Sequence, residues 1–324
     1  MSRYPLIIIG LGVCLVGGVV IAAGKPTLVN YSGNGSDLQQ VIDAAQPGTT
    51  IVCDSSRQYE FSTPITIKQT IILKGLNARL PEKLGRTPLI EVKAEGVTLT
   101  NLTLHGNHDS VDQKYRASLI NIYKGRFLVA DCKFYDSSKN GVTVCPEPGS
   151  SKDIVGGEIK NIEAFRLGRD AVSISGGNRG LRVRDITVGN VSLKKGYRRG
   201  AVEVSDGSDN IKVKNVYAED CPYAIDVQDH NGKSAPNTNI EISNVTAVNC
   251  NNIIRTANSH RNHANLILRN LKGTNCALPV QISHTKNVLV DGLTILEHKN
   301  KKSAPIKLKN CHGITFKNVS IDSL

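Results

Sequence analysis

The sequence has 324 residues and is basic, with 40 Lys and Arg residues against 28 Asp and Glu residues. It contains eight cysteines, no tryptophan and only 4% aromatic residues. The length allows either two ordinary globular domains or one elongated array of repeats. The scattered cysteines argue against a small disulfide-rich domain, and the shortage of aromatic side chains argues against a protein that stacks nucleic-acid bases or grips neutral sugars.

Residues 1–24 differ from the rest of the chain. An apolar stretch runs from Leu6 to Gly24 and ends in small residues. This pattern predicts a signal peptide that is removed before Lys25, and therefore a secreted, periplasmic or cell-surface protein. A stretch of about 19 apolar residues also allows an uncleaved membrane anchor, which would be the only contact with a membrane. Residues 25–324 are expected to form one domain and a monomer.

A short amphipathic helix is predicted at residues 36–46. Ser36 and Gln39 have the spacing of a capping box, and Pro47 with Gly48 ends the segment. One face of this helix is apolar because of Leu38, Val41, Ile42 and Ala45. In a stack of coils, such a helix would cover the exposed end of the core.

A short pattern returns through most of the chain: two alternating apolar residues, then Asn or Asp, then two more alternating apolar residues. Period-2 alternation is typical of strands, and its return every 22 to 30 residues is typical of a solenoid. An amide side chain at this position can bond to the equivalent residue one coil away. The residues assigned to this position are Asn101, Asp131, Asn161, Asp185, Asn215, Asn244, Asn270, Gly292 and Asn318.

A second column of strands runs in parallel with the first. It consists of apolar triplets, namely Val142–Val144, Val172–Ile174, Val202–Val204, Ile225–Val227, Ile254–Thr256, Val280–Ile282 and Ile306–Leu308. Cys221, Cys250 and Cys276 each precede a triplet by the same distance, so they should form an internal column. Such thiols are expected to be buried rather than to bind metal, while a disulfide between neighbours is geometrically possible.

The segment DLQQVIDAAQPGTTI and the asparagine coils resemble the pectin-lyase-like superfamily over nearly all of residues 30–324. The resemblance implies an all-β fold, a right-handed parallel β-helix of about nine or more coils with a short N-terminal capping helix. It also implies activity on polysaccharides, frequently rich in uronic acids, through hydrolases, lyases and epimerases. Because the superfamily includes members without known catalysis, the fold alone does not decide the function.

The middle residue of each triplet should point outward, so that successive coils build one column on the surface. In chain order this column reads Thr143, Ser173, Glu203, Asp226, Arg255, Gln281 and Lys307. Glu203 and Asp226 lie one coil apart, and mutual repulsion between two such carboxylates raises the pKa of one, which suits acid and base catalysis. The alternative is a solvated face on which Asp226 simply pairs with Arg255.

Polar residues in the loops around Glu203 and Asp226 should converge on the same side of the coils. Arginine side chains there suit carboxylate or sulfate groups. The candidate substrate-binding residues are Arg169, Arg198, Arg199, Asp206, Asp229, His230, Arg255 and His260.

The segment GRDAVSISGG is similar to a polygalacturonase motif in which two adjacent aspartates precede a strand. Asp170 matches the second aspartate, which helps to activate water in that family. Arg169 replaces the first aspartate, which is the proton donor, and Asn140 and Gly200 replace a further aspartate and a histidine. These departures argue against ordinary polygalacturonase activity and leave Asp170 as a candidate.

The sequence thus predicts an exported enzyme that acts on an acidic polysaccharide. A hydrolase would use Asp170, Glu203 and Asp226 for acid and base chemistry. A lyase would use Arg199 or Arg255 as or beside the base, with Ca²⁺ neutralising the uronate; no other cofactor or metal is expected. The alternatives are a non-catalytic glycan-binding protein and a structural or adhesive one, whereas nucleic acid is not expected as a partner.

Overall fold

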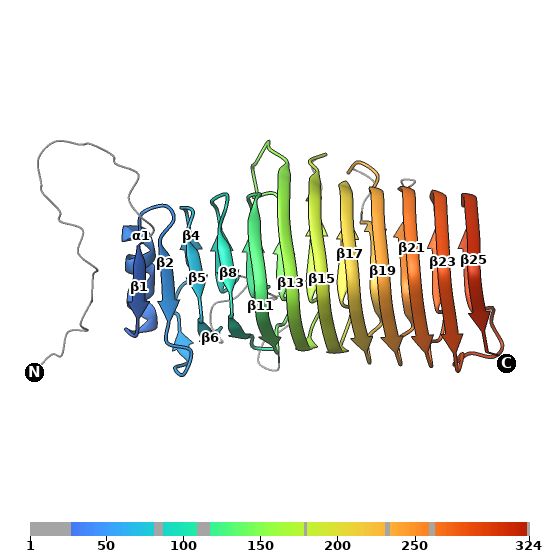
Figure 1. Cartoon of the computed structure of the whole chain (residues 1–324), viewed down its shortest axis with the longest axis horizontal. Coiled ribbons are helices and arrows are strands. Elements are labelled where there is room, and N and C mark those ends of the chain that lie inside the picture. The colour runs from blue at the N-terminus through green and yellow to red at the C-terminus, as the bar shows by residue number, and fades with distance from the viewer. Residues whose placement is uncertain are drawn as a thin grey trace, which may run out of the picture.

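The computed structural model describes residues 27–80, 87–108, 117–177, 180–230, 234–258 and 263–322. In these residues, parallel strands stack side by side along one axis, with β1 at one end of the stack and β25 at the other (Figure 1). The predicted signal peptide, residues 1–24, and the candidate His260 lie outside the described residues. Within the described residues, no helix has the length and apolar character needed to cross a bilayer.

The larger of two sheets has 15 strands and forms one wall of the stack. Its strands are β1 (Leu28–Tyr31), β2 (Thr50–Cys53), β3 (Tyr59–Glu60), β5 (Ile72–Lys74), β6 (Asn77–Arg79), β8 (Thr98–Thr100), β9 (Thr103–His105), β11 (Phe127–Tyr135), β13 (Ile154–Leu167), β15 (Val183–Gly196), β17 (Ser208–Glu219), β19 (Thr238–Val248), β21 (His263–Thr274), β23 (Thr285–Leu296) and β25 (His312–Ile321).

The smaller sheet has 10 strands, one for each coil. They are β4 (Ile65–Ile67), β7 (Ile90–Val92), β10 (Ile120–Ile122), β12 (Val142–Val144), β14 (Val172–Ser175), β16 (Val202–Ser205), β18 (Tyr223–Asp229), β20 (Asn252–Asn258), β22 (Val280–Ser283) and β24 (Ile306–Lys309). The prediction of a right-handed parallel β-helix with nine or more coils is confirmed.

The asparagines of the repeat stand where the strands of the larger sheet bend. Asn161 and Asn215 have φ angles of 56° and 57°, in the left-handed region that Asn and Asp adopt more readily than other residues with a Cβ. The side-chain amide of each donates to the residue one coil earlier: Asn161 to Asp131 at 2.8 Å, and Asn215 to Asn190 at 2.8 Å. Because the donors all point toward the N-terminal end, this ladder finishes on an acceptor-only carboxylate, Asp131.

One assignment in the repeat was wrong. Asn190, and not Asp185, occupies the position between Asn161 and Asn215, because Ile159 pairs with Val188 and Ile162 with Val191. Both residues fit the pattern of alternating apolar neighbours, so spacing alone did not separate them. Asp185 instead ends a second, shorter ladder by accepting from the amide of Asn210 at 2.6 Å.

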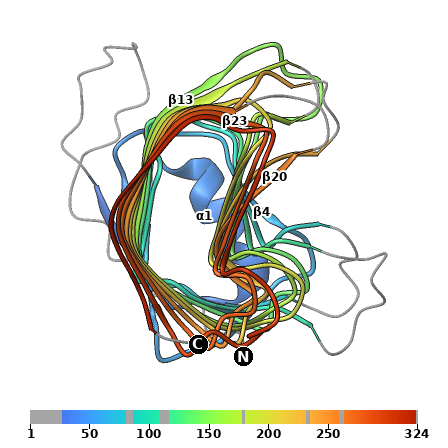
Figure 2. The same ribbon diagram turned by 90° about the vertical axis from the view of Figure 1, so that its right-hand side faces the viewer.

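Helix α1 (Gly35–Ala44) covers the end of the core, as predicted for residues 36–46. It lies within the outline of the coils when the stack is viewed along its axis (Figure 2). Leu38 and Ile42 are fully buried. Asn34, rather than Ser36, is the N-cap, and Gln39 bonds to both backbone groups of Thr66 at 2.8 and 3.0 Å, which satisfies the first strand of the smaller sheet.

The interior of the stack is apolar along its whole length because alternate residues of every strand point inward. Cys221, Cys250 and Cys276 lie in this interior as free thiols with at most 4% exposure, which confirms the prediction of a buried column. The opposite faces of the strands, and the loops between the sheets, therefore carry the polar groups available for function.

Candidate functional site

The predicted surface column is in direct register across the smaller sheet. Ser173 pairs with Glu203, Glu203 with Asp226, and Asp226 with Arg255. Thr143 precedes them and Gln281 and Lys307 follow, in the predicted order. Loops project on both sides of this sheet (Figure 2), so the column lies at the bottom of a loop-flanked face.

The three candidate carboxylates do not line an open groove. Asp170 and Asp226 have no exposed surface and Glu203 has only 1%. Arginine side chains contact them: Arg169 and Arg199, which precede β14 and β16, both bond to Glu203, and Arg255 of β20 bonds to Asp226. The side chains of Arg169 and Arg199 retain 21% and 22% exposure, so arginines rather than carboxylates face the solvent.

Glu203 is the most highly bonded of these carboxylates. It accepts from Ser173 Oγ at 2.7 Å and Arg169 Nη2 at 3.4 Å, and it also bonds to Arg199 and Gln228. Nε2 of His230 lies 3.3 Å from its Oε1. Burial raises the pKa of Glu203, but the bond from His230 and the charges of the two arginines outweigh burial and hold the pKa well below its ordinary value. Glu203 is therefore ionised.

Asp170 has the opposite character. Its Oδ1 accepts from the backbone N–H of Gly200 at 3.3 Å and from the hydroxyl of Tyr223 at 3.5 Å. Its buried Oδ2 has no hydrogen-bond partner among the described residues and lies 3.8 Å from Nε of Arg169. Burial raises the pKa of Asp170 well above its ordinary value, and the negative charge of Glu203 raises it further. The pKa values of Asp170 and Glu203 are therefore shifted in opposite directions.

Asp226 forms a two-bond pair with Arg255, whose Nε lies 3.1 Å from Oδ1 and whose Nη2 bonds to Oδ2. Burial raises the pKa of Asp226 despite the opposing effect of Arg255. The guanidinium of Arg255 also lies over the ring of Tyr223, 4.5 Å from its centroid. The expected pairing of Asp226 with Arg255 is thus present, but it is buried rather than solvated.

His230 connects two acidic groups at the end of β18. Its Nδ1 lies 2.6 Å from Oδ2 of Asp206, and its backbone N–H donates to Oδ1 of the same residue at 2.8 Å. The bonds to Asp206 and Glu203 raise the pKa of His230 to about 9. His230 is consequently a cation at neutral pH and donates toward both carboxylates.

The remaining candidates are less closely involved. Arg198 is exposed and makes no hydrogen bond or ion pair within the described ranges. Asp229 is buried at the end of β18. Tyr223 was not predicted as a site residue. The alternation that places Ile225 in the apolar core also assigns Tyr223 to that core. Its hydroxyl instead contacts Asp170, an arrangement for which the sequence carries no signal.

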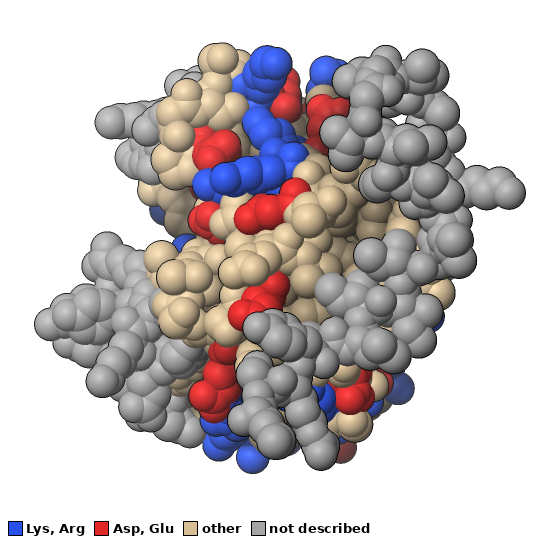
Figure 3. Space-filling model, turned by 90° about the vertical axis from the view of Figure 1, so that its left-hand side faces the viewer, with Lys and Arg blue, Asp and Glu red and all other residues tan. Residues whose placement is uncertain are grey.

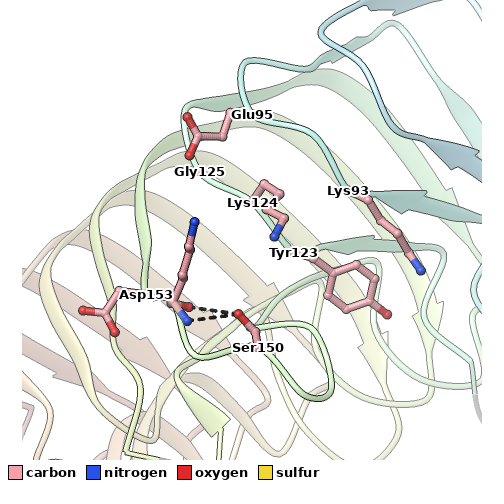
Figure 4. Close-up of a pocket in the computed structure, with 8 residues that line it drawn as sticks. Lys93, Glu95, Tyr123, Lys124, Gly125, Ser150 and Asp153 are labelled. Atoms are coloured by element: carbon pink, nitrogen blue, oxygen red, sulfur yellow. Dashed lines mark hydrogen bonds between the residues drawn. The ribbon is translucent and has the colours of Figure 1, made fainter.

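Two depressions lie along the same sheet, on either side of the carboxylate cluster. One, of about 270 Å³, lies on the N-terminal coils beside Lys93, Tyr123 and Ser150 (Figure 4). The other, of about 440 Å³, lies on the C-terminal coils beside Asn252, Leu278 and Lys307. On the face at the N-terminal end, basic and acidic side chains lie next to one another, so that face is not uniformly basic (Figure 3).

The carboxylate cluster does not fit Ca²⁺. Glu203 and Asp226 already bind guanidinium groups, and a cation beside them would face Arg169, Arg199 and Arg255. In the described part of the chain, no group of three or more His, Cys, Asp and Glu side chains is arranged to hold a metal ion.

No protein-family model matches the chain, and no curated protein matches its sequence. Solved structures do resemble it. The pre-mature gene product 12 of bacteriophage phi29 has a TM-score of 0.64 at 14% identity, with 90% of this chain and 49% of that chain covered. The enzymatically active domain of tailspike protein 2 of bacteriophage CBA120 has a TM-score of 0.60 at 11% identity, with 86% and 44% covered.

The tailspike protein of Dettilon is also similar, with a TM-score of 0.55 at 11% identity and 91% and 68% of the two chains covered. The chain shares the fold of these structures, and in this chain that fold is a parallel β-helix. The likeness is one of fold alone, and it agrees with the fold that the sequence predicted. The chain spans less than half of the length of each of the first two of these structures.

Proposed function

We propose that this protein is an exported hydrolase that acts on an acidic polysaccharide. The observation that carries the proposal is the pair Asp170 and Glu203, whose environments shift their pKa values in opposite directions. A protonated carboxylic acid beside an ionised carboxylate is the combination that general acid and base hydrolysis of a glycosidic bond requires.

In this proposal each residue has a distinct task. Asp170 donates a proton to the leaving glycosidic oxygen, and Glu203 accepts a proton from the attacking water. The half-buried guanidinium groups of Arg169 and Arg199 bind the carboxylates of the sugar chain, and in doing so they move away from Asp170 and Glu203 and expose both. Asp226 orients Arg255 through the two-bond pair. Net positive charge on the chain, +12, favours the approach of an anionic polymer.

Hydrolysis is favoured over elimination for two reasons. A lyase that used Arg199 or Arg255 as its base would need that side chain in its neutral form, whereas neighbouring carboxylates raise the pKa values of both arginines despite burial and keep them protonated. A lyase that neutralises uronate with Ca²⁺ also needs oxygen ligands that are not already bound to arginine. One similar structure is that of the enzymatically active domain of a tailspike, which agrees with an enzymatic role for this fold.

The test is a panel of polygalacturonate, alginate and sulfated galactans, assayed for new reducing ends and for the ultraviolet absorbance of unsaturated uronates. We expect reducing ends without that absorbance. Asp170→Asn and Glu203→Gln should each lower turnover by about 100-fold or more. Glu163→Gln, a carboxylate-to-amide change at an exposed position on the larger sheet, should leave turnover unchanged. Unsaturated products would contradict the proposed hydrolysis.

A second candidate function is glycan binding without catalysis. The observation that favours it is the complete burial of Asp170 and Asp226 beneath arginine side chains, which leaves cations as the groups a glycan meets first. It predicts salt-sensitive retention on an anionic polysaccharide and no product from any member of the panel. Glu203→Gln would then retain binding, whereas Arg199→Gln would weaken it.

A further inference from the structure

Three cations form a row along one flank of the smaller sheet. Lys139, Arg169 and Arg199 each stand three residues before a strand of that sheet, namely β12, β14 and β16. These strands are neighbours in register, and the backbone N–H of Arg169 donates to the carbonyl oxygen of Lys139 at 2.8 Å. This cation row therefore advances by about 4.8 Å per coil, the spacing of neighbouring strands. The proposed hydrolysis uses both arginines but not Lys139.

Lys139 differs from the other cations of this region in having no counter-charge. The cations that contact the carboxylate cluster all have a carboxylate partner, in the pairs Arg169–Glu203, Arg199–Glu203, His230–Asp206 and Arg255–Asp226. By contrast, the half-buried side chain of Lys139 forms no ion pair or hydrogen bond with any residue that the structure describes. The cation row thus carries a positive charge that the protein itself does not pair.

The surroundings of Lys139 disfavour its charged form. Burial lowers the pKa of the ammonium group, and the positive charge of Arg169 lowers it further. The thiol of Cys145 and the carboxyl groups of Glu203 and Asp170 act in the opposite direction, but they do not cancel this shift. An anion bound beside Lys139 and Arg169 would supply the negative charge that this position lacks.

Buried hydrogen bonds fix the backbone that carries Lys139. Ser137 Oγ accepts from the backbone N–H of Lys139 at 3.2 Å and donates to the carbonyl oxygen of Asn140 at 2.9 Å. The side-chain amide of Asn140 donates to Oγ1 of Thr143 at 2.9 Å, and its oxygen accepts from the backbone N–H of Asp170 at 3.2 Å. Ser137 and Asn140 are each only 1% exposed. Because this backbone is already ordered, an anion that binds Lys139 has to order only the lysine side chain.

We propose that Lys139 is a substrate-binding residue, which holds the carboxylate of the sugar next to those held by Arg169 and Arg199. A sugar ring and its linkage advance an extended chain by a distance close to the spacing of the coils, so each cation of the row can meet a different sugar. This inference rests on the proposed function, because it assigns the cation row to the substrate of the carboxylate cluster. It adds that this substrate carries a carboxylate on each of three consecutive sugars.

The experiment measures the affinity of digalacturonate, trigalacturonate and the methyl ester of trigalacturonate by calorimetry. The Asp170→Asn background slows the proposed hydrolysis during the titration. In this background Lys139→Gln should bind trigalacturonate about tenfold more weakly than the parent does. Digalacturonate should be unaffected because the two arginines hold both of its carboxylates, and the methyl ester should be unaffected because it is neutral. Lys212→Gln, which removes the same charge from the exposed face of β17, should bind all three as the parent does.

Thermal unfolding separates substrate binding from a structural role of Lys139. Since the ammonium group has no counter-charge, Lys139→Gln should unfold at the same temperature as the wild-type protein or at a higher one. An unfolding temperature below that of Lys212→Gln would show that the side chain stabilises the fold, and it would overturn the proposal.

The binding outcomes distinguish this inference from the proposed function. Equal affinity of Lys139→Gln and its parent for trigalacturonate would overturn the role of Lys139 alone. An equal loss for digalacturonate or for the methyl ester would also overturn it, since neither the third sugar nor its charge would then matter. No binding of any chain by the parent would overturn it together with the proposed substrate class. Binding by the wild-type protein without hydrolysis would overturn only the hydrolase, provided that the expected losses are found.

Discussion

Glu203 and Asp226 are direct register partners on strands β16 and β18, yet the environment shifts their carboxyl pKa values in opposite directions. The difference arises from the number of bonds each receives. Glu203 is contacted by two arginines, His230, Ser173 and Gln228, whereas Asp226 is held mainly by Arg255. Position within the sheet is therefore less important for the charge state than the loops that cover each strand.

Replacing Glu203 with Gln should destabilise the protein by about 3 kcal/mol. The substitution leaves Arg199, Arg169 and His230 close together without the carboxylate that they share, and an uncompensated buried charge is costly. Urea unfolding followed by circular dichroism measures the loss. The control is Ser173→Ala, which removes one hydrogen bond and should cost about 1 kcal/mol. A Glu203→Gln cost no larger than that of the control would contradict this account.

Replacing Asp170 with Asn should lower turnover by about 100-fold or more while stabilising the protein at neutral pH by about 1–2 kcal/mol. The folded-state pKa of Asp170 is raised, so its contribution to stability is complete below the unfolded-state pKa and is lost as the pH rises through the folded-state pKa. Asn keeps the acceptor for Gly200 and cannot ionise. Thermal unfolding at pH 4 and pH 7 tests this, and a variant that is less stable than the wild type at pH 7 would refute it.

Because of His230, the stability of the protein should fall at alkaline pH. Its pKa is raised to about 9, so its stabilising contribution is complete below about pH 6.5 and is lost as the pH rises through 9. The amplitude should be about 1–2 kcal/mol, less than the full shift implies, since the side chain is nearly one-third exposed to solvent. Unfolding free energies of wild type and His230→Gln should converge between pH 7 and pH 10; a constant difference would exclude this role.

The asparagine ladder should be sensitive to backbone conformation as well as to hydrogen bonding. Asn215 has a φ of 57°, donates to Asn190 at 2.8 Å and accepts from Asn244 at 2.9 Å. Asn215→Gly loses both bonds but accommodates the left-handed conformation, so it should cost about 1 kcal/mol. Asn215→Val should cost about 1–2 kcal/mol more, because a β-branched residue is strained there. Chemical unfolding of both variants measures the two losses of stability. Equal losses would show that the left-handed backbone conformation at Asn215 does not contribute to the difference.

The repeat and its period could be predicted from the sequence because each strand has its own pattern of alternating apolar residues. Apolar alternation around Asn161 and Asn215, and the triplets that contain Glu203 and Asp226, predicted the coils and the register of the surface column. In the repeat, Asp185 was assigned to the position that Asn190 occupies, because both residues lie between alternating apolar residues. The bounds of the cap helix shifted for a related reason, since Gln39 bonds to Thr66 on another strand instead of to its own helix end.

The sequence by itself determined that this chain winds into stacked parallel coils and that Glu203, Asp226 and Arg255 lie one above another, because strand alternation and repeat length fix both. Only the tertiary structure decided that Asp170 and Glu203 are buried beside arginines and that their pKa values are shifted in opposite directions. Those properties come from side chains of several coils that meet in space, such as Tyr223 of β18, which contacts Asp170 across 53 residues. Desolvation depends on these contacts and not on any local sequence pattern.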